Sequence, residues 1–226
     1  KDKIFPKEVV ALYLPNSIDY IVSYFAISML GAIVLPVYWN LSERDITHLL
    51  KFTKTFLCIT NEVGKKNLAC DINTHVVSKQ FNYNTSEDIS LHNKYNEDAC
   101  LFLQTSGTTS SPKIVAHTFG TIINNIEGHI KSLDLNPSDV VLITLPMPFG
   151  YSNTSQLLAH IYLGSTIVLS DSLKHPKSIL RDIQTHKVTT TTFVPTILKT
   201  LGLLKPPIFE KFNLTSLRYI CFGGGS

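Results

Sequence analysis

Blocks of apolar and polar residues alternate along the chain in a way that predicts strands and helices in turn. The predicted strands lie at residues 8–14, 32–37, 55–60, 99–104, 113–116, 140–144, 165–169, 190–193 and 217–222. The predicted helices lie at residues 17–30, 42–52, 118–131, 153–163, 177–185 and 195–203. Asn16 or Ser17 can cap the first helix, and Ser42 with Asp45 has capping-box spacing ahead of the second. This order favours an α/β fold built on parallel sheets with helices on their faces.

One polar stretch interrupts the alternation. Residues 81–98 are rich in Asn and weakly acidic, which is typical of a connector. We therefore expect layered α/β subdomains at residues 1–80 and 99–226, the first partial at its start and the second truncated at its end. Lys1 lies shortly before a core-type strand, and Ser226 ends a run of glycines directly after another. Both ends therefore suggest a fragment.

Composition excludes several classes of protein. Of 226 residues, 44% are hydrophobic and 16% are charged, so the chain can bury a sizeable core. No run of about 18 apolar residues occurs, and we expect no membrane span. The net charge of +3 is spread thinly along the chain, which argues against a nucleic-acid partner. Four cysteines and the histidines fit no disulfide framework or metal pattern, so we expect reduced thiols, no metal ligands and a cytoplasmic protein.

Residues 105–113 are the stretch that most clearly suggests chemistry. They read Thr-Ser-Gly-Thr-Thr-Ser-Ser-Pro-Lys and follow an apolar strand. Gly107 allows close approach of the backbone to a ligand, and exposed N–H groups in such a turn form an anion-binding nest. The hydroxyl groups add donors and Lys113 adds a positive charge, which suits a polyphosphate. The segment has no Gly-Lys pair and is not a Walker A loop. From composition alone, an ordinary Ser/Thr-rich surface loop remains the alternative.

The order of these residues resembles the phosphate loop of the adenylate-forming superfamily. That superfamily includes acyl-CoA synthetases, aryl-CoA ligases, luciferases and nonribosomal-peptide adenylation domains, whose loop reads T-S-G-[ST]-T-G-x-P-K-G. The matching positions are Thr105, Ser106, Gly107, Thr108, Thr109, Pro112 and Lys113. Ser110 and Ile114 stand where the family has Gly. Segments 14–17, 31–37, 41–50, 192–196 and 216–225 also resemble the family in the same order.

The resemblance implies part of an AMP-forming carboxylic acid ligase. Such enzymes use ATP and Mg²⁺ to convert an acid to an acyl-adenylate, and pass the acyl group to coenzyme A or to the phosphopantetheine of a carrier protein. By this resemblance, Thr105, Ser106, Gly107, Thr108, Thr109 and Lys113 bind the ATP phosphates, and Gly223, Gly224 and Gly225 lie against adenine. The family's glutamate ligand of Mg²⁺ and its catalytic lysine fall beyond Ser226. We therefore expect the fragment alone to be inactive.

The acid would occupy a pocket at Phe149, Gly150 and Tyr151. Relatives that activate amino acids have F-D-x-S here, and their Asp pairs with the substrate ammonium. This chain has Gly150 at that position, which argues against an α-amino acid, because an unpaired buried ammonium is costly. A fatty, aryl or other simple acid is favoured. Two alternatives stay open. Phe149 and Tyr151 can be ordinary core aromatics, and Ser110 and Ile114 fit a degenerate nucleotide- or acyl-binding module without ligase activity.

Overall fold

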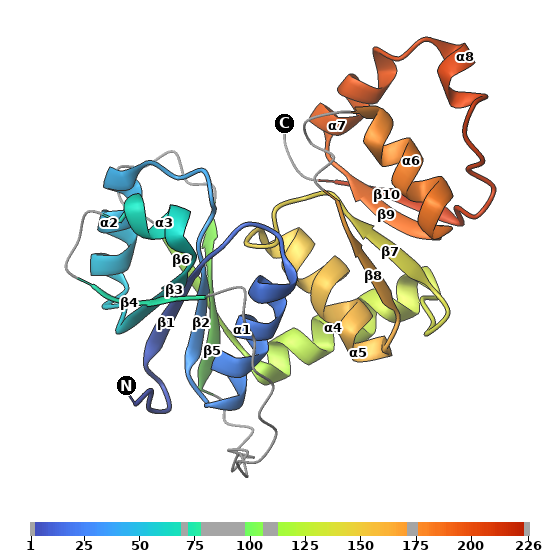
Figure 1. Cartoon of the computed structure of the whole chain (residues 1–226). Helices are drawn as coiled ribbons and strands as arrows, with labels where there is room; N and C mark the ends of the chain where they lie inside the picture. The colour runs from blue at the N-terminus through green and yellow to red at the C-terminus, as the bar shows by residue number, and fades with distance from the viewer. Residues whose placement is uncertain (1–2, 69–71, 78–97, 106–112, 171–175, 224–226) are drawn as a thin grey trace. The chain divides into compact units, whose positions relative to one another are not determined.

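The computed structural model describes residues 3–68, 72–77, 98–105, 113–170 and 176–223 (Figure 1). The chain forms two compact units, Lys1–Ile122 and Ile123–Ser226. Among the helices in these described ranges, none has the length and apolar character needed to cross a membrane.

The first unit is built on a six-stranded sheet with the order β4-β3-β1-β2-β5-β6 (Figure 1). Its first five strands are parallel, and β6 runs antiparallel to β5. The strands are β1 (Val9–Tyr13), β2 (Ile33–Pro36), β3 (Leu57–Thr60), β4 (Asn73–Val76), β5 (Ala99–Thr105) and β6 (Lys113–Thr118). The helices are α1 (Ile18–Met29), α2 (Glu43–Phe52) and α3 (Glu62–Lys66).

Caps and apolar spacing explain where these helices form. The Ser17 hydroxyl accepts a hydrogen bond from the Tyr20 N–H at 3.1 Å and starts α1. The Ser42 hydroxyl does the same for α2 through the Asp45 N–H at 3.2 Å. Helix α2 buries one stripe of residues, Ile46, Leu49 and Leu50, against a core that includes residues of β1, β2 and β3.

The second unit is built on a parallel four-stranded sheet with the order β10-β9-β7-β8. Its strands are β7 (Val140–Ile143), β8 (Thr166–Leu169), β9 (Thr190–Phe193) and β10 (Tyr219–Phe222). The other elements are α4 (Phe119–Leu133), which begins in the first unit, the π-helix η1 (Tyr151–Leu158), α5 (Ala159–Leu163), α6 (Pro176–His186), α7 (Pro195–Gly202) and α8 (Pro206–Phe209). Apolar residues of α6 and α7 pack with β7 and β9 to form its core.

The strand order of the second unit creates a switch point. The chain passes from β7 to β8 on one side and then returns to place β9 on the other side of β7. Ligands of open parallel α/β sheets bind in the crevice outside the carboxyl ends of the strands at such a point. The end of the sheet beyond Ile143 and Phe193 is therefore where a binding site is expected.

The α/β class and all nine predicted strands are confirmed, and the strand bounds shift by up to two residues. The boundary at residue 99 differs from the structure, because β5 and β6 complete the first sheet. Residues 106–112 are too few for a parallel crossover, which needs a dozen or more residues, so β6 pairs antiparallel. Three short elements were not predicted from the sequence: α3, α8 and the edge strand β4, each four or five residues long.

Candidate functional site

The phosphate-loop segment starts and ends on the β5–β6 hairpin. Thr105 and Lys113 are register partners at the end of this hairpin, and both are exposed. The Thr105 hydroxyl donates to the Lys113 carbonyl at 3.5 Å. Thr105 also lies at the carboxyl end of a strand that is parallel to its neighbour β2. The other predicted phosphate-binding residues, Ser106, Gly107, Thr108 and Thr109, lie outside the described residues.

In the second unit, the carboxyl ends of the strands bring together residues from three segments. Tyr151 follows β7, Thr192 lies near the end of β9, and Gly223 directly follows β10. A hydrogen bond joins the side chains of Tyr151 and Thr192. A Cβ atom on Gly223 would lie 3.3 Å from Cε1 of the Tyr151 ring, which is tighter than an ordinary contact. Gly223 therefore lets the chain pass directly against this ring.

The environment of Tyr151 favours a neutral phenol. Burial raises the pKa of Tyr151, and the nearby Cys221 thiol acts in the same direction. The hydrogen bond with Thr192 opposes these effects without cancelling them. Tyr151 thus presents a protonated hydroxyl and a ring that is partly buried against the core of the unit. Such a side chain can stack on a planar group and exchange hydrogen bonds with a polar one.

The neighbouring pocket residues are placed differently. The Phe149 side chain is 44% exposed, so it is not a core aromatic. Gly150 has φ of −49°, which any residue can adopt, and its carbonyl accepts a hydrogen bond from the Thr154 hydroxyl at 2.9 Å. The structure thus brings predicted residues Tyr151 and Gly223 into contact. Gly224 and Gly225, the other predicted adenine contacts, lie outside the described residues.

A π-helix holds Tyr151 in place, whereas the residue pattern predicts an ordinary helix from residue 153. Polar contacts join η1 to β7 and the segment after it: the Ser152 hydroxyl donates to the Leu145 carbonyl at 3.3 Å, and Gln156 Nε2 donates to the Leu142 carbonyl at 3.4 Å. Both side chains are buried. π-helical turns are rare and occur frequently at functional sites. Because the carbonyl partners of these side chains lie on β7 and just after it, the residue pattern of η1 alone gave no signal for this irregular segment.

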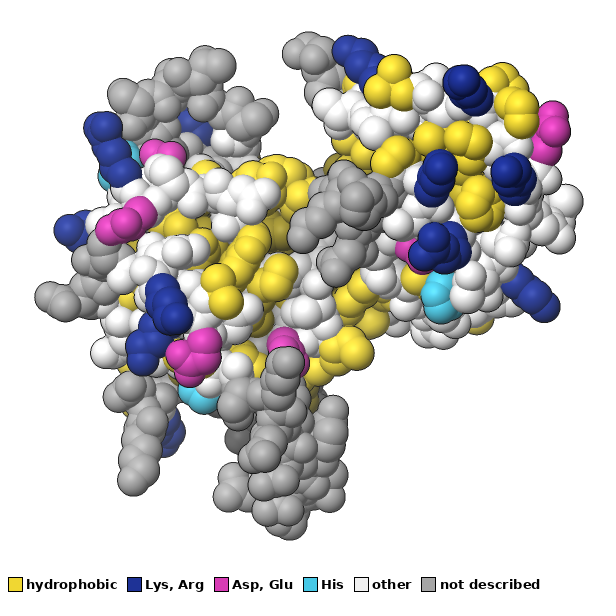
Figure 2. Space-filling view, turned by 45° about the horizontal axis from the view of Figure 1, so that its top comes forward, with side chains coloured by type: hydrophobic (Ala, Val, Ile, Leu, Met, Phe, Trp, Pro, Cys, Tyr) yellow, Lys and Arg dark blue, Asp and Glu magenta, His cyan; other side chains and the backbone are white. Residues whose placement is uncertain are grey.

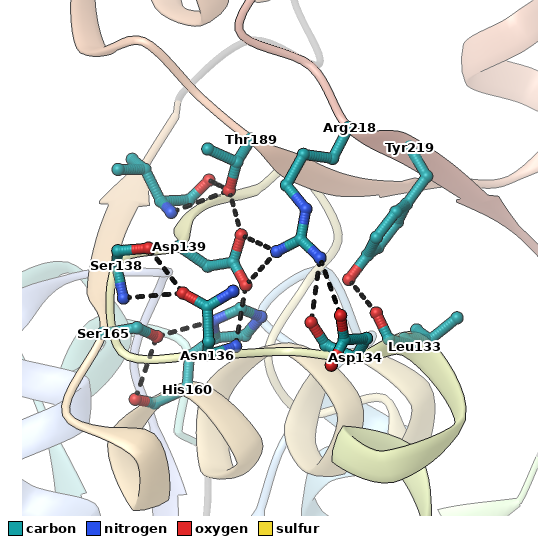
Figure 3. A network of polar contacts seen from close by, with 11 residues as sticks. Leu133, Asp134, Asn136, Ser138, Asp139, His160, Ser165, Thr189, Arg218 and Tyr219 are labelled. Atoms are coloured by element: carbon teal, nitrogen blue, oxygen red, sulfur yellow. Dashed lines mark hydrogen bonds and ion pairs between the residues drawn. The ribbon is translucent and has the colours of Figure 1, made fainter.

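A second polar cluster lies at the amino ends of the same strands, away from the candidate site (Figure 3). Asp139 precedes β7, Thr189 precedes β9 and Arg218 precedes β10. Asp139 is 1% exposed and accepts hydrogen bonds from the Asn136 N–H, the Thr189 hydroxyl and Arg218. Burial raises the pKa of Asp139, but these hydrogen bonds and the Arg218 charge outweigh burial and hold it below its usual range.

His160 is a buried histidine in the same unit. It is 2% exposed, and its Nδ1 lies 2.7 Å from the Ser165 hydroxyl oxygen. Burial lowers the pKa of His160 to about 4; the Asp139 carboxylate opposes this shift, and His129 adds to it. His160 is therefore neutral at pH 7. Neither Asp139 nor His160 was predicted as a site residue, because neither lies in a recognisable sequence motif.

On the face drawn in Figure 2, Lys and Arg side chains are separated from one another by neutral and apolar ones. Across the described parts of the chain, no group of three or more His, Cys, Asp or Glu side chains could hold a metal ion. Cys58, Cys100 and Cys221 are free thiols.

Comparisons with known proteins agree with the resemblance in the sequence. A 4-coumarate–CoA ligase of Arabidopsis thaliana is 28% identical over 96% of this chain and 41% of its own length. A 4-coumarate–CoA ligase of Nicotiana tabacum is 26% identical over 99% of this chain and 44% of its own length. The chain therefore spans about two fifths of the curated relatives it matches.

Solved structures share the fold. O-succinylbenzoate coenzyme A synthetase from Bacillus subtilis, in complex with AMP, matches with a TM-score of 0.82 and 24% identity over 98% of this chain and 56% of its own. The N-terminal domain of FACL13 from Mycobacterium tuberculosis matches with a TM-score of 0.85 and 21% identity over 98% of this chain and 58% of its own. The family model of the AMP-binding enzymes matches residues 2–226. The chain belongs to the AMP-binding enzyme family.

Proposed function

We propose that this chain supplies the nucleotide- and acid-binding elements of an AMP-forming acid–thiol ligase. The observation that carries the proposal is the meeting of Tyr151, Thr192 and Gly223 at the switch point of a parallel sheet. In the reaction, a carboxylate oxygen attacks the α-phosphorus of ATP, and the bond to the pyrophosphate oxygen breaks. A thiol then displaces AMP from the acyl carbon, and the acyl group becomes a thioester.

The two units contribute different parts of this chemistry. In the first unit, the loop at Thr105–Thr109 and Lys113 binds the ATP phosphates, where backbone N–H groups and one positive charge stabilise the departing pyrophosphate. Mg²⁺, when bound, neutralises further phosphate charge. In the second unit, Gly223, Gly224 and Gly225 contact adenine, because a chain without side chains can lie flat against a planar base.

An aryl acid is the substrate class that we favour. The relatives are named for 4-coumarate, and a structural neighbour is named for o-succinylbenzoate. Both are acids with an aromatic ring, which suits the rings of Phe149 and Tyr151. Gly150 offers no carboxylate for an ammonium group. Coenzyme A is the favoured acceptor because the relatives are CoA ligases, with a carrier protein as the alternative. Free thiols at Cys58, Cys100 and Cys221 fit a cytoplasmic location.

Binding of a non-hydrolysable adenylate tests this proposal on the chain itself. The probe is 4-coumaroyl-sulfamoyl-adenosine, titrated by calorimetry. We expect the wild-type chain to bind it and Gly223→Ala to bind about tenfold more weakly, which is a loss of about 1.4 kcal/mol. The added Cβ, 3.3 Å from Tyr151, forces the ring or the ligand to move.

Gly202→Ala is the matched control. A Cβ on Gly202, at the end of α7, would have no neighbour within 4 Å, so binding should not change. Absence of binding by the folded wild-type chain, or equal loss in the two variants, would contradict the proposed site and leave the degenerate-module alternative.

A further inference from the structure

Within the described residues, the strand that leads to Gly223 is paired with a neighbour on one side only. Among the described strands, β10 pairs with β9 alone and lies at the edge of its sheet (Figure 1). Two of its four side chains, Ile220 and Phe222, are 45% and 61% exposed, so one row of the strand contributes little packing. Edge strands with few neighbours open at low free-energy cost unless other contacts fix them.

Arg218 supplies such contacts at the amino end of β10 (Figure 3). Its Nη1 lies 2.8 Å from both carboxylate oxygens of Asp139, and its Nη2 donates to the Asp134 carbonyl at 2.8 Å. The adjacent Tyr219 hydroxyl donates to the Leu133 carbonyl at 2.7 Å. The start of β10 is thereby fixed to the segment between α4 and β7.

Asp139 makes this attachment specific. It is 1% exposed, and further hydrogen bonds from the Asn136 N–H, at 2.9 Å, and the Thr189 hydroxyl, at 2.7 Å, hold its two oxygens in place. Removing Arg218 would leave a buried carboxylate without its counter-charge, which is strongly unfavourable. The position of the guanidinium, and of the strand that follows it, is therefore set by a fixed partner.

The other end of β10 reaches the candidate site. Five residues after Arg218, about 16 Å along an extended strand, Gly223 lies against the Tyr151 ring, and its N–H donates to the Phe193 carbonyl at 3.3 Å. Because the start of β10 is fixed, Gly223 at its end occupies a defined position. We propose that Arg218 and Asp139 are positioning residues, which hold β10 in register so that Gly223 meets the adenine of ATP. The adenine part rests on the proposed function, whereas the positioning of β10 does not.

A purely structural role is the competing explanation, and a double variant separates the two. Arg218→Met breaks the attachment and also leaves Asp139 unpaired. Asp139→Asn with Arg218→Met removes the unpaired charge but leaves β10 unattached. If the pair serves only to neutralise a buried charge, the double variant restores wild-type behaviour. If it positions β10, the double variant regains stability while β10 stays loose.

The thiol of Cys221 provides a readout of β10 that needs no catalysis. Cys221 lies within the strand and is half-buried, whereas Cys58 and Cys100 are buried. Its alkylation by iodoacetamide, located by peptide mass spectrometry, therefore reports opening of β10. ATP with MgCl₂ and tripolyphosphate with MgCl₂ are titrated in parallel, because tripolyphosphate carries no adenine and should depend on the first unit alone.

We expect Arg218→Met and the double variant to alkylate Cys221 about tenfold faster than wild type and to bind ATP about tenfold more weakly, with tripolyphosphate binding unchanged. Arg218→Lys keeps the positive charge but loses the contact of Nη1 with both Asp139 oxygens. Its alkylation rate at Cys221 and its affinity for ATP should therefore lie between those of Arg218→Met and wild type. Arg181→Met, on the exposed face of α6, is the matched control.

Cys221 reactivity within twofold of wild type in folded Arg218→Met would overturn the inference, and so would full recovery in the double variant. A wild-type chain that binds tripolyphosphate but not ATP would instead contradict the proposed adenine site. In that case the alkylation rate of Cys221 would still show whether the Arg218–Asp139 pair positions β10. If Arg218→Met does not fold, the alkylation rates of Cys221 in the double variant and in Arg218→Lys test the same inference.

Discussion

Two ionisable side chains in the second unit, Asp139 and His160, are buried but differ in charge state. Asp139 stays charged because Arg218 and two further hydrogen-bond donors, the Asn136 N–H and the Thr189 hydroxyl, surround its carboxylate. The Nδ1 of His160 lies 2.7 Å from the Ser165 hydroxyl oxygen, and burial keeps the imidazole neutral. The two groups therefore respond to acid in different pH ranges.

We predict that His160 makes the chain less stable between pH 6.5 and pH 4. Its folded pKa, about 4, lies below the unfolded value of about 6.5, so only the unfolded chain takes up this proton in that range. The free energy of unfolding should fall by up to about 1.4 kcal/mol per pH unit from this group, and by about 3 kcal/mol in all. Asp139, whose pKa is lowered, loses its contribution only below about pH 4.

The measurement is urea unfolding at several pH values for wild type and His160→Gln. The variant should show a shallower slope by about one proton, whatever its absolute stability. Parallel slopes for wild type and His160→Gln would show that His160 is protonated in the folded chain as well.

At the scale of elements, the sequence predicts those whose local signals are strong. Apolar runs located the nine strands, and Ser17 and Ser42 located two helix starts. Elements with weak sequence signals were not predicted: β4 is a polar edge strand, and α8 spans four residues with two prolines. The π-helix at Tyr151–Leu158 was also invisible, because its wide turns arise from buried hydrogen bonds to β7 rather than from its own residue pattern.

The cap of α1 gives a test at this scale. Ser17→Ala removes the acceptor of the Tyr20 N–H, and we expect the free energy of unfolding to fall by about 1 kcal/mol. Ser132→Ala near the end of α4, whose hydroxyl is exposed, should change it by less than about 0.5 kcal/mol. Equal losses in chemical denaturation would show that Ser17 does not act as a cap.

At the scale of the whole molecule, the sequence predicted the protein family better than it predicted where the chain divides into two compact units. The order of residues 105–113 indicated the family, whereas the hairpin they join moved the boundary between compact units to Ile122. The contact of Tyr151 with Gly223 joins residues far apart in the chain and needed the structure. The Asp139–Arg218 pair needed it too, because neither residue belongs to a recognisable sequence pattern.

The central claim, activation of an aryl acid by ATP, is tested most directly by carboxylate-dependent ATP–pyrophosphate exchange. It is measured on the natural polypeptide that carries these residues, with 4-coumarate, benzoate, fatty acids and phenylalanine in parallel. We predict exchange with the aryl acids, little with fatty acids and none with phenylalanine, because Gly150 offers no partner for an ammonium group. Exchange with phenylalanine alone, or none with any acid from folded protein, would contradict the account.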